Sequence, residues 1–304
     1  MRLAGIDIGS NAARLLITEV QKNENEDAVF NKVDLIRVPL RLGFDVFEQG
    51  VISEERKSML LNTMIAFKYL LKAYNVSAVK ACATSAMRDA ANSKEIIETV
   101  KEKTGIEISI ISGEQEASLV FENHIADVLT HENAYLYIDV GGGSTEIDFF
   151  LHDKQLYKKS FNIGTIRLLQ NKWNKADWKK TEEEIKKNVR AALPVIAIGT
   201  GGNINKVFSI SKTKEKQPLS LQKLKVYYKF LSALSVKERM KQFDLKADRA
   251  DVIVPALEIY IKIMTWVKAD KIIVPHIGVA DGLVRDLYKE MNDEKDSIQK
   301  QQQN

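Results

Sequence analysis

The chain has 304 residues, 45% of them hydrophobic and 28% charged, a composition typical of a water-soluble enzyme with a sizeable core and two domains rather than one. Its 45 basic and 41 acidic residues give a net charge of +4, too small to indicate a protein that binds DNA or RNA. No apolar run of about 18 residues is present to span a membrane, and a strand-like segment begins directly after Met1, so we expect a cytoplasmic protein without a membrane partner.

The first part of the chain alternates between strand and helix patterns. Ser53 is a good N-cap, and Glu54 and Glu55 follow it in the first turn of a long helix that we expect to reach about Tyr74. Strands are expected over residues 2–9, 14–20, 31–40, 78–83 and 106–111, and further helices over 92–103 and 114–128. This alternation predicts a parallel or mixed sheet covered by helices.

The second part restarts the same pattern at Ala134. Strands are expected over 135–140, 146–151, 155–161, 194–198 and 271–274, with helices near 164–172, 180–190, after residue 202, over 220–267 and up to about Met291. Polar residues 293–304 are expected to form a flexible tail. We therefore predict a domain over 1–124 and a second over 125–304, with the last helix able to pack back on the first.

One kind of turn occurs in both parts of the chain. Residues 6–11 read IDIGSN and residues 138–145 read IDVGGGST, so each copy has an apolar strand, an aspartate, glycine and a hydroxyl residue. Glycine lets backbone N–H groups approach an anion, and an aspartate at a strand end holds a divalent cation. A third glycine turn, at residues 199–202, joins a strand to a helix and suits phosphate or simply a tight turn. Two facing loops would bind a polyanion between two domains.

Lysines are dense between residues 154 and 190 and again between 212 and 225. A solvated helix face and a surface that guides a long anionic substrate both fit this pattern.

Together these segments resemble the exopolyphosphatase and guanosine pentaphosphate phosphohydrolase (Ppx/GppA) family. The matching segments, in the family's order, are IDIGSNAARLL at 6–16, ATSAMRDAAN at 83–92, IISGEQEASLVF at 110–121, IDVGGGSTEI at 138–147, GTGGNINKV at 199–207 and, more weakly, GVADGLV at 278–284. The resemblance implies two α/β, ribonuclease-H-like domains of the actin, sugar-kinase and Hsp70 superfamily with a cleft between them. It also implies the short, two-domain form of the family and a homodimer.

Residue chemistry, together with the resemblance in the case of Glu116, assigns a role to each candidate residue. Glu116 matches the family's catalytic glutamate, which would activate water, and Arg88 would stabilise charge on the phosphoryl group. Asp139 is the best Mg²⁺ ligand, supported by Asp7 and Glu146. Phosphate oxygens would be held by residues of the three glycine turns and by Lys206, which follows the third turn at helical spacing. The turn residues are Gly9, Ser10, Asn11, Gly142, Gly143, Ser144, Thr145, Gly201 and Gly202. The implied reaction is Mg²⁺-dependent release of terminal phosphate from inorganic polyphosphate or of the 5′ phosphate from guanosine pentaphosphate.

Simpler structural roles remain open for the same residues. Glu116 also suits the first turn of a helix, where acids are favoured. Asp139 and Asp7 also suit buried strand ends satisfied by hydrogen bonds. Arg88 would instead form a salt bridge with Asp89 or another acid. Lys206 would instead be an ordinary surface lysine. The single Cys82 excludes an internal disulfide and is expected to be a buried strand residue rather than a nucleophile.

Two other functions fit the same fold. A kinase resembling acetate or sugar kinases would transfer phosphate to an acceptor other than water, because fold alone does not choose the acceptor. A noncatalytic sensor would bind polyphosphate or the alarmone and report it to a partner.

Overall fold

The computed structural model describes residues 1–24, 27–124, 130, 132–152, 154–214 and 217–302, with only the backbone described for 120–124 and 294–302. Contacts divide the chain into two compact units: residues 1–112, 118–123 and 279–304 form the first, and residues 113–117 and 124–278 form the second. The predicted boundary at residue 124 adjoins residues 125–129, which lie outside the described residues. The contacts group the last helix with the first unit.

The first unit is built on a five-stranded sheet with the strand order β3-β2-β1-β4-β5. Its strands are β1 (Arg2–Ile8), β2 (Ala13–Lys22), β3 (Ala28–Val38), β4 (Ala78–Ala83) and β5 (Ile108–Ile110). Its helices are α1 (Leu42–Gln49), α2 (Glu54–Ala73), α3 (Ser85–Asp89), α4 (Ser93–Thr104) and α13 (Val279–Gln302). The strands β1, β2 and β3 pair in antiparallel fashion, whereas β4 and β5 continue in parallel from β1.

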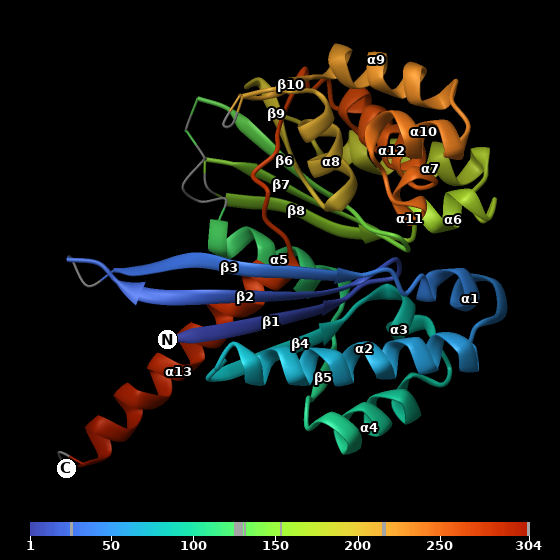
Figure 1. Cartoon of the computed structure of the whole chain (residues 1–304). Coiled ribbons are helices and arrows are strands. Elements are labelled where there is room, and N and C mark those ends of the chain that lie inside the picture. The colour runs from blue at the N-terminus through green and yellow to red at the C-terminus, as the bar shows by residue number, and fades with distance from the viewer. Residues whose placement is uncertain (25–26, 125–129, 131, 153, 215–216, 303–304) are drawn as a thin grey trace. The chain divides into compact units, whose positions relative to one another are not determined.

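The first turns of helix α13 pack on this sheet (Figure 1). Ala280 and Val284 join Leu3, Leu16 and Val20 in one apolar cluster. A Cβ on Gly5 would lie 2.4 Å from the Ala280 carbonyl oxygen, so only glycine permits this close approach of β1 and α13. Two ion pairs, from Lys80 of β4 to Asp286 at 2.6 Å and to Glu290 at 2.5 Å, extend the contact along the helix.

The second unit is built on a six-stranded sheet with the order β10-β11-β9-β6-β7-β8. Its strands are β6 (Ala134–Val140), β7 (Thr145–Leu151), β8 (Lys154–Phe161), β9 (Val195–Thr200), β10 (Leu219–Ser220) and β11 (Lys271–Ile273). Its helices are α6 (Thr165–Leu169), α7 (Lys175–Asn188), α8 (Gly202–Ile210), α9 (Leu221–Ser232), α10 (Val236–Phe243), α11 (Ala247–Ala250) and α12 (Ile253–Trp266). Helix α5 (Gly113–His124) begins in this unit and continues among residues of the first.

The two sheets share one plan, since β6, β7, β8, β9 and β11 repeat the order and directions of β1 to β5. One face of the second sheet packs into a large apolar core with α12, through residues such as Leu136, Ile138 and Ile147. The opposite face carries Tyr137, Asp139, Glu146 and Asp148, because side chains alternate along a strand. These polar side chains are nevertheless buried.

Most expected elements are present, and three observations differ from the expectation. Helix α1, helix α3 and the short strand β10 were not predicted. Helix α13 continues to Gln302, because lysine, glutamate and glutamine extend a helix that packing has already begun, and the flexibility expected of residues 293–304 stays a prediction.

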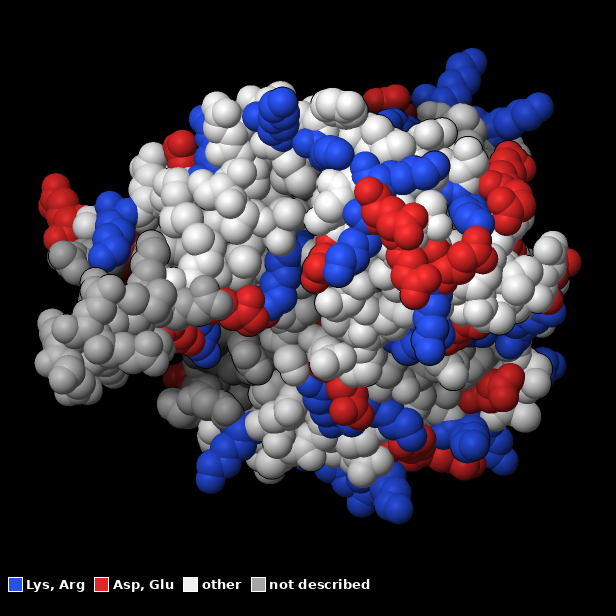
Figure 2. Space-filling model, turned by 90° about the horizontal axis from the view of Figure 1, so that it is seen from below, with Lys and Arg blue, Asp and Glu red and all other residues white. Residues whose placement is uncertain are grey.

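Charge on the face seen in Figure 2 is mixed, with Lys and Arg side chains interspersed among Asp and Glu. None of the helices within the described residues is apolar enough over sufficient length to cross a membrane.

Candidate functional site

The first glycine turn follows β1 and is held by hydrogen bonds from distant residues. The Gly9 N–H donates to the Ala12 carbonyl at 3.1 Å, which closes the turn. The N–H groups of Arg41 and Gly43 donate to the carbonyls of Asn11 and Ser10, both at 2.9 Å. The Gly9 amide is therefore used inside the turn itself.

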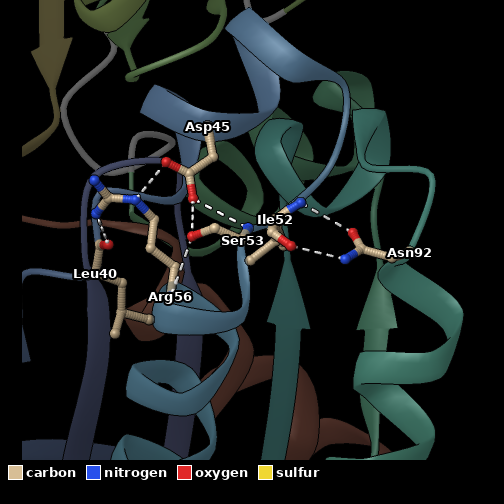
Figure 3. A network of polar contacts seen from close by, with 6 residues as sticks. All are labelled: Leu40, Asp45, Ile52, Ser53, Arg56 and Asn92. Carbon is tan, nitrogen blue, oxygen red and sulfur yellow. Dashed lines mark hydrogen bonds and ion pairs between the residues drawn. The ribbon is translucent and has the colours of Figure 1, made fainter.

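A network of polar contacts braces the segment that holds this turn (Figure 3). Arg56 donates to the Leu40 carbonyl at 2.9 Å and to Asp45 at 2.7 Å. Asp45 also accepts from the Ser53 N–H at 3.1 Å and the Ser53 hydroxyl at 2.5 Å. Burial raises the pKa of Asp45, but the hydrogen bonds from Ser53 and Arg56 outweigh burial and lower it overall. The network thus fixes residues 40–45, two of which bind the turn.

Arg41 at the start of α1 has an unusual backbone conformation that the sequence did not reveal. Its φ of 54° is left-handed, and its side chain makes no capping hydrogen bond. The guanidinium instead lies over the Phe44 ring, 4.0 Å from its centroid. The bond from the Arg41 N–H to Asn11 compensates for this conformation, which costs free energy for a residue other than glycine.

Asp7 and Arg88 both have partners inside the first unit. Asp7 is the penultimate residue of β1, is almost fully buried and accepts from Arg14 of β2, its register partner, at 2.5 Å. Arg88 donates to the Ile111 carbonyl at 3.0 Å, whereas its distance to Asp89 is 4.0 Å. The alternative pairing of Arg88 with Asp89 is therefore the weaker contact, and the carboxylate of Asp7 already carries one charge-assisted hydrogen bond.

The second glycine turn presents its N–H groups in a common direction. The carbonyls of Gly141, Gly142 and Gly143 accept from Thr165 at 3.0 Å, Ile166 at 2.9 Å and Arg167 at 2.8 Å, all in or at the start of α6. In a trans peptide the C=O and N–H point in opposite directions, and the described chain has no cis bond. The N–H groups of Gly142, Gly143 and Ser144 therefore point away from α6, as an anion-binding loop requires.

Two residues at this turn shape it further. A Cβ on Gly164 would lie 2.4 Å from the Gly142 carbonyl, so glycine is required where α6 approaches the turn. Thr145 is fully buried and its hydroxyl donates to the Ile163 carbonyl at 2.6 Å. The Thr145 hydroxyl therefore stabilises the loop, and the candidate phosphate donors here are the backbone N–H groups and Ser144.

Asp139 and Glu146 face one another across β6 and β7 as register partners, and both are buried. Like charges directly opposite in a sheet destabilise it unless a cation or protons compensate. Glu146 accepts from the Ser160 hydroxyl at 2.9 Å. Two carboxylates suit Mg²⁺, which commonly binds one or two of them and takes its other ligands from water and substrate phosphates. Among the described residues no group of three or more acidic, histidine or cysteine side chains is arranged to hold a metal alone.

The third glycine turn meets Asp139. Thr200 is the register partner of Asp139 on β9, and Gly201 follows with a φ of +103°. A Cβ on Gly201 would lie 2.9 Å from Asp139 Oδ1, so both conformation and space require glycine. Gly202 begins α8, and its carbonyl accepts from Arg249 at 2.5 Å. Lys206 lies on the same helix and is half-buried.

Glu116 lies in the first turn of α5, in the part of the helix that belongs to the second unit. Gly113 begins this turn against β7 and β8: a Cβ there would lie 2.4 Å from the Ser160 hydroxyl and 2.9 Å from Glu146 Oε1. Glu116 is half-buried, whereas Glu114 is exposed. The helix turn that carries Glu116 therefore lies against β8 and against β7, the strand that carries Glu146.

A further buried carboxylate, Asp148, lies two residues beyond Glu146 on the same face of β7. It is fully buried and accepts from Gln155 at 2.7 Å. Burial raises the pKa of Asp148 to about 6, while the charge of Lys158 and the Gln155 hydrogen bond oppose the rise. Its sequence position gave no sign of this behaviour.

The chain is similar to known proteins over most of its length. Residues 20–291 match the Ppx/GppA phosphatase family. The chain is 30% identical over 302 residues to the bifunctional 3-dehydroquinate synthase/phosphatase of Fusobacterium nucleatum, covering 89% of this chain and 44% of that protein. It is 25% identical over 275 residues to exopolyphosphatase 1 of Mycobacterium tuberculosis, covering 84% of this chain and 78% of that protein. The chain thus spans less than half the length of the first of these relatives.

Solved structures are similar over nearly the whole chain. The Aquifex aeolicus member of the Ppx/GppA family has a TM-score of 0.75 at 26% identity, covering 95% of this chain and 98% of that one. An exopolyphosphatase from Cytophaga hutchinsonii has a TM-score of 0.80 at 24% identity, covering 96% and 98%. With the two α/β sheets, these likenesses confirm the predicted fold class of ribonuclease-H-like domains of the actin, sugar-kinase and Hsp70 superfamily.

Proposed function

The chain belongs to the Ppx/GppA phosphatase family, and on this basis we propose that it is a phosphoanhydride hydrolase that releases terminal phosphate from inorganic polyphosphate. The observation that carries the proposal is the second glycine turn, whose N–H groups point away from α6 beside two opposed carboxylates. The names of relatives such as exopolyphosphatase 1 of Mycobacterium tuberculosis support polyphosphate as the substrate.

In this proposal the backbone binds the anion and stabilises developing charge. The N–H groups of Gly142, Gly143 and Ser144 bind phosphoryl oxygens in one loop, and those of Ser10 and Asn11 bind them in the other. Fixed donors of this kind stabilise a transition state without reorganisation during the reaction. Arg88 adds a guanidinium that forms bidentate contacts with phosphate. Lys206 and the turn at Gly201 and Gly202 contact the more distant phosphates.

Glu116 is proposed to accept a proton from the attacking water. A carboxylate within hydrogen-bond reach of that water supplies the base that this reaction needs. The first turn of α5 sits firmly on β7 and β8, because Gly113 packs against Ser160 and Glu146. This packing supports a defined position for Glu116.

Asp139 and Glu146 are the proposed ligands of Mg²⁺, with Asp7 supporting through water. When bound, the ion would neutralise charge on the phosphoryl oxygens of the substrate. Asp139 and Glu146 fit this role because they are opposed and buried, and because carboxylate oxygens are the ligands that Mg²⁺ prefers.

Three finer statements are also proposals. The 5′ phosphate of guanosine pentaphosphate is a second substrate, as the family name suggests. A homodimer is expected from the resemblance, and analytical ultracentrifugation tests it. A cytoplasmic location is tested by fractionation of the source cells.

Phosphate release tests the proposal. Tripolyphosphate, long polyphosphate, guanosine pentaphosphate and ATP are compared with Mg²⁺ and with a chelator, for the wild type and for Glu116→Gln. Loss of a general base lowers turnover by about 100-fold or more, so Glu116→Gln should nearly abolish release. The matched control is Glu114→Gln, an exposed change in the same helix turn, which should leave release intact.

Several outcomes contradict the proposal. Normal turnover by Glu116→Gln would reject the role of that residue, and full activity with the chelator would reject Mg²⁺. ADP formation from ATP that requires a sugar or carboxylate acceptor would favour a kinase. Tight binding of polyphosphate without release would favour a sensor.

A further inference from the structure

A chain of two hydroxyl groups ends at the carboxylate of Asp139 inside the second unit. Tyr137 lies two residues before Asp139 on the same face of β6, and Thr200 is the register partner of Asp139 on β9. The Tyr137 hydroxyl lies 2.7 Å from Thr200 Oγ1 and donates to Asp139 Oδ2 at 3.3 Å. Tyr137 and Thr200 are fully buried, so protein groups and not bulk water determine these hydrogen bonds.

The protons in this chain of hydroxyls have one consistent arrangement. A carboxylate accepts hydrogen bonds, so the Tyr137 hydroxyl is the donor in its contact with Asp139. Tyrosine has a single O–H group, and donation to Asp139 uses it. Thr200 must then donate to Tyr137, and the chain runs from Thr200 through Tyr137 to Oδ2 of Asp139.

A hydrogen bond from a core residue fixes the backbone of Thr200. Its backbone carbonyl accepts a hydrogen bond from the hydroxyl of Tyr260, which is buried in α12. This contact links the end of β9 to the main core of the unit. The hydroxyl chain therefore starts from a rigid residue.

The other oxygen of Asp139 faces the third glycine turn. A Cβ on Gly201 would lie 2.9 Å from Oδ1, and the glycine leaves that oxygen room. The hydroxyl chain thus holds Oδ2 of Asp139, while Oδ1 lies beside the third glycine turn. A carboxylate with a fixed rotamer loses less entropy when it binds a cation.

We propose that Tyr137 and Thr200 are positioning residues that hold Asp139 in the orientation in which it binds a divalent cation. This inference rests on the proposed role of Asp139 in the reaction above. If the hydroxyls only satisfied a buried carboxylate, removing them would lower the free energy of unfolding and leave cation affinity unchanged. Cation affinity therefore separates a positioning role from a structural one.

The experiment measures Mg²⁺ binding by calorimetric titration without substrate, and the Mg²⁺ dependence of phosphate release. Removing a hydrogen bond that orients a metal ligand lowers metal affinity by about tenfold or more, so we expect about a tenfold loss of Mg²⁺ affinity in Tyr137→Phe and Thr200→Val. Turnover at saturating Mg²⁺ should change much less. Thr200→Ser keeps the hydroxyl and should keep the affinity.

Tyr135→Phe is the matched control. Tyr135 lies on the same strand and the same face, but its hydroxyl contacts Thr130, at 3.0 Å from the backbone nitrogen, rather than Asp139. This variant should bind Mg²⁺ like the wild type. If Tyr137→Phe does not fold, the contrast between Thr200→Val and Thr200→Ser decides the question alone.

The failure of this inference differs from that of the proposed function. Variants that bind Mg²⁺ as tightly as an active wild type would overturn the inference and leave the hydrolase proposal standing. Loss of affinity in the variants, with a wild type that hydrolyses none of the four substrates, would support the inference and reject the hydrolase. A wild type that binds no Mg²⁺ would also overturn the inference.

Discussion

Replacement of Asp148 by asparagine should stabilise the protein at neutral pH. Asp148 is fully buried, and its pKa rises from 3.8 to about 6 in the folded state. A raised pKa means that the folded state holds this proton more tightly than the unfolded state does. Its contribution to stability is therefore fully present below about pH 4 and is lost as the pH rises through about 6. A shift of about two pH units at about 1.4 kcal/mol each amounts to about 3 kcal/mol.

Asparagine carries no charge and can still accept from Gln155. Urea unfolding of Asp148→Asn and of the wild type between pH 4 and 8 should therefore show the variant more stable at pH 8, by up to about 3 kcal/mol, with the difference closing towards pH 4. Glu183→Gln, at a position whose side chain is 67% exposed, should show no comparable gain. A variant that is no more stable than the wild type at pH 8, or a difference independent of pH, would refute the reasoning.

Three further changes test the packing and the polar contacts. Asp45→Ala should lower the free energy of unfolding by about 2–3 kcal/mol in urea, because it leaves Arg56 and Ser53 without their partner. Glu107→Ala, in an exposed pair with Lys101, should have little effect. Since the pKa of Asp45 is lowered, its contribution to stability should disappear as the pH falls below 3.8. Gly5→Ala should lower the free energy of unfolding by about 2–3 kcal/mol in the same assay, since its Cβ would overlap the Ala280 carbonyl. Gly278→Ala, with open space around the added Cβ, should leave the stability unchanged. Equal effects of the two changes would reject the close approach of β1 and α13. Gly201→Ala should lower the free energy of unfolding by about 1–3 kcal/mol and should also lower the rate of phosphate release. Normal release would show that the third turn does not shape the site around Asp139.

Local patterns predicted the elements that local chemistry controls. Ser53 caps α2 as expected, with its hydroxyl accepting from the Arg56 N–H at 3.4 Å. The hairpin of β7 and β8 turns at His152, between the strands expected over 146–151 and 155–161. The aspartate and glycine turns lie at strand ends in both units, because glycine, aspartate and an apolar run together specify that geometry.

The elements that sequence patterns missed depend on distant contacts. Helix α1 starts at an arginine with a left-handed φ, and bonds to Ser10 and Asn11, some 30 residues earlier in the chain, hold it there. The contact of Tyr137 with Thr200 joins positions 63 apart and requires the parallel register of β6 and β9. The burial of Asp148 depends on tertiary packing that an alternating strand pattern does not specify.

The central claim is that water attacks the terminal phosphorus of a polyphosphate, and hydrolysis in ¹⁸O-labelled water tests it most directly. Mass spectrometry of the phosphate released from tripolyphosphate with Mg²⁺ should find one ¹⁸O in each molecule, because the water oxygen joins the departing phosphoryl group. Phosphate that carries no label, or a phosphoryl group that appears only on an added alcohol or carboxylate, would contradict the account.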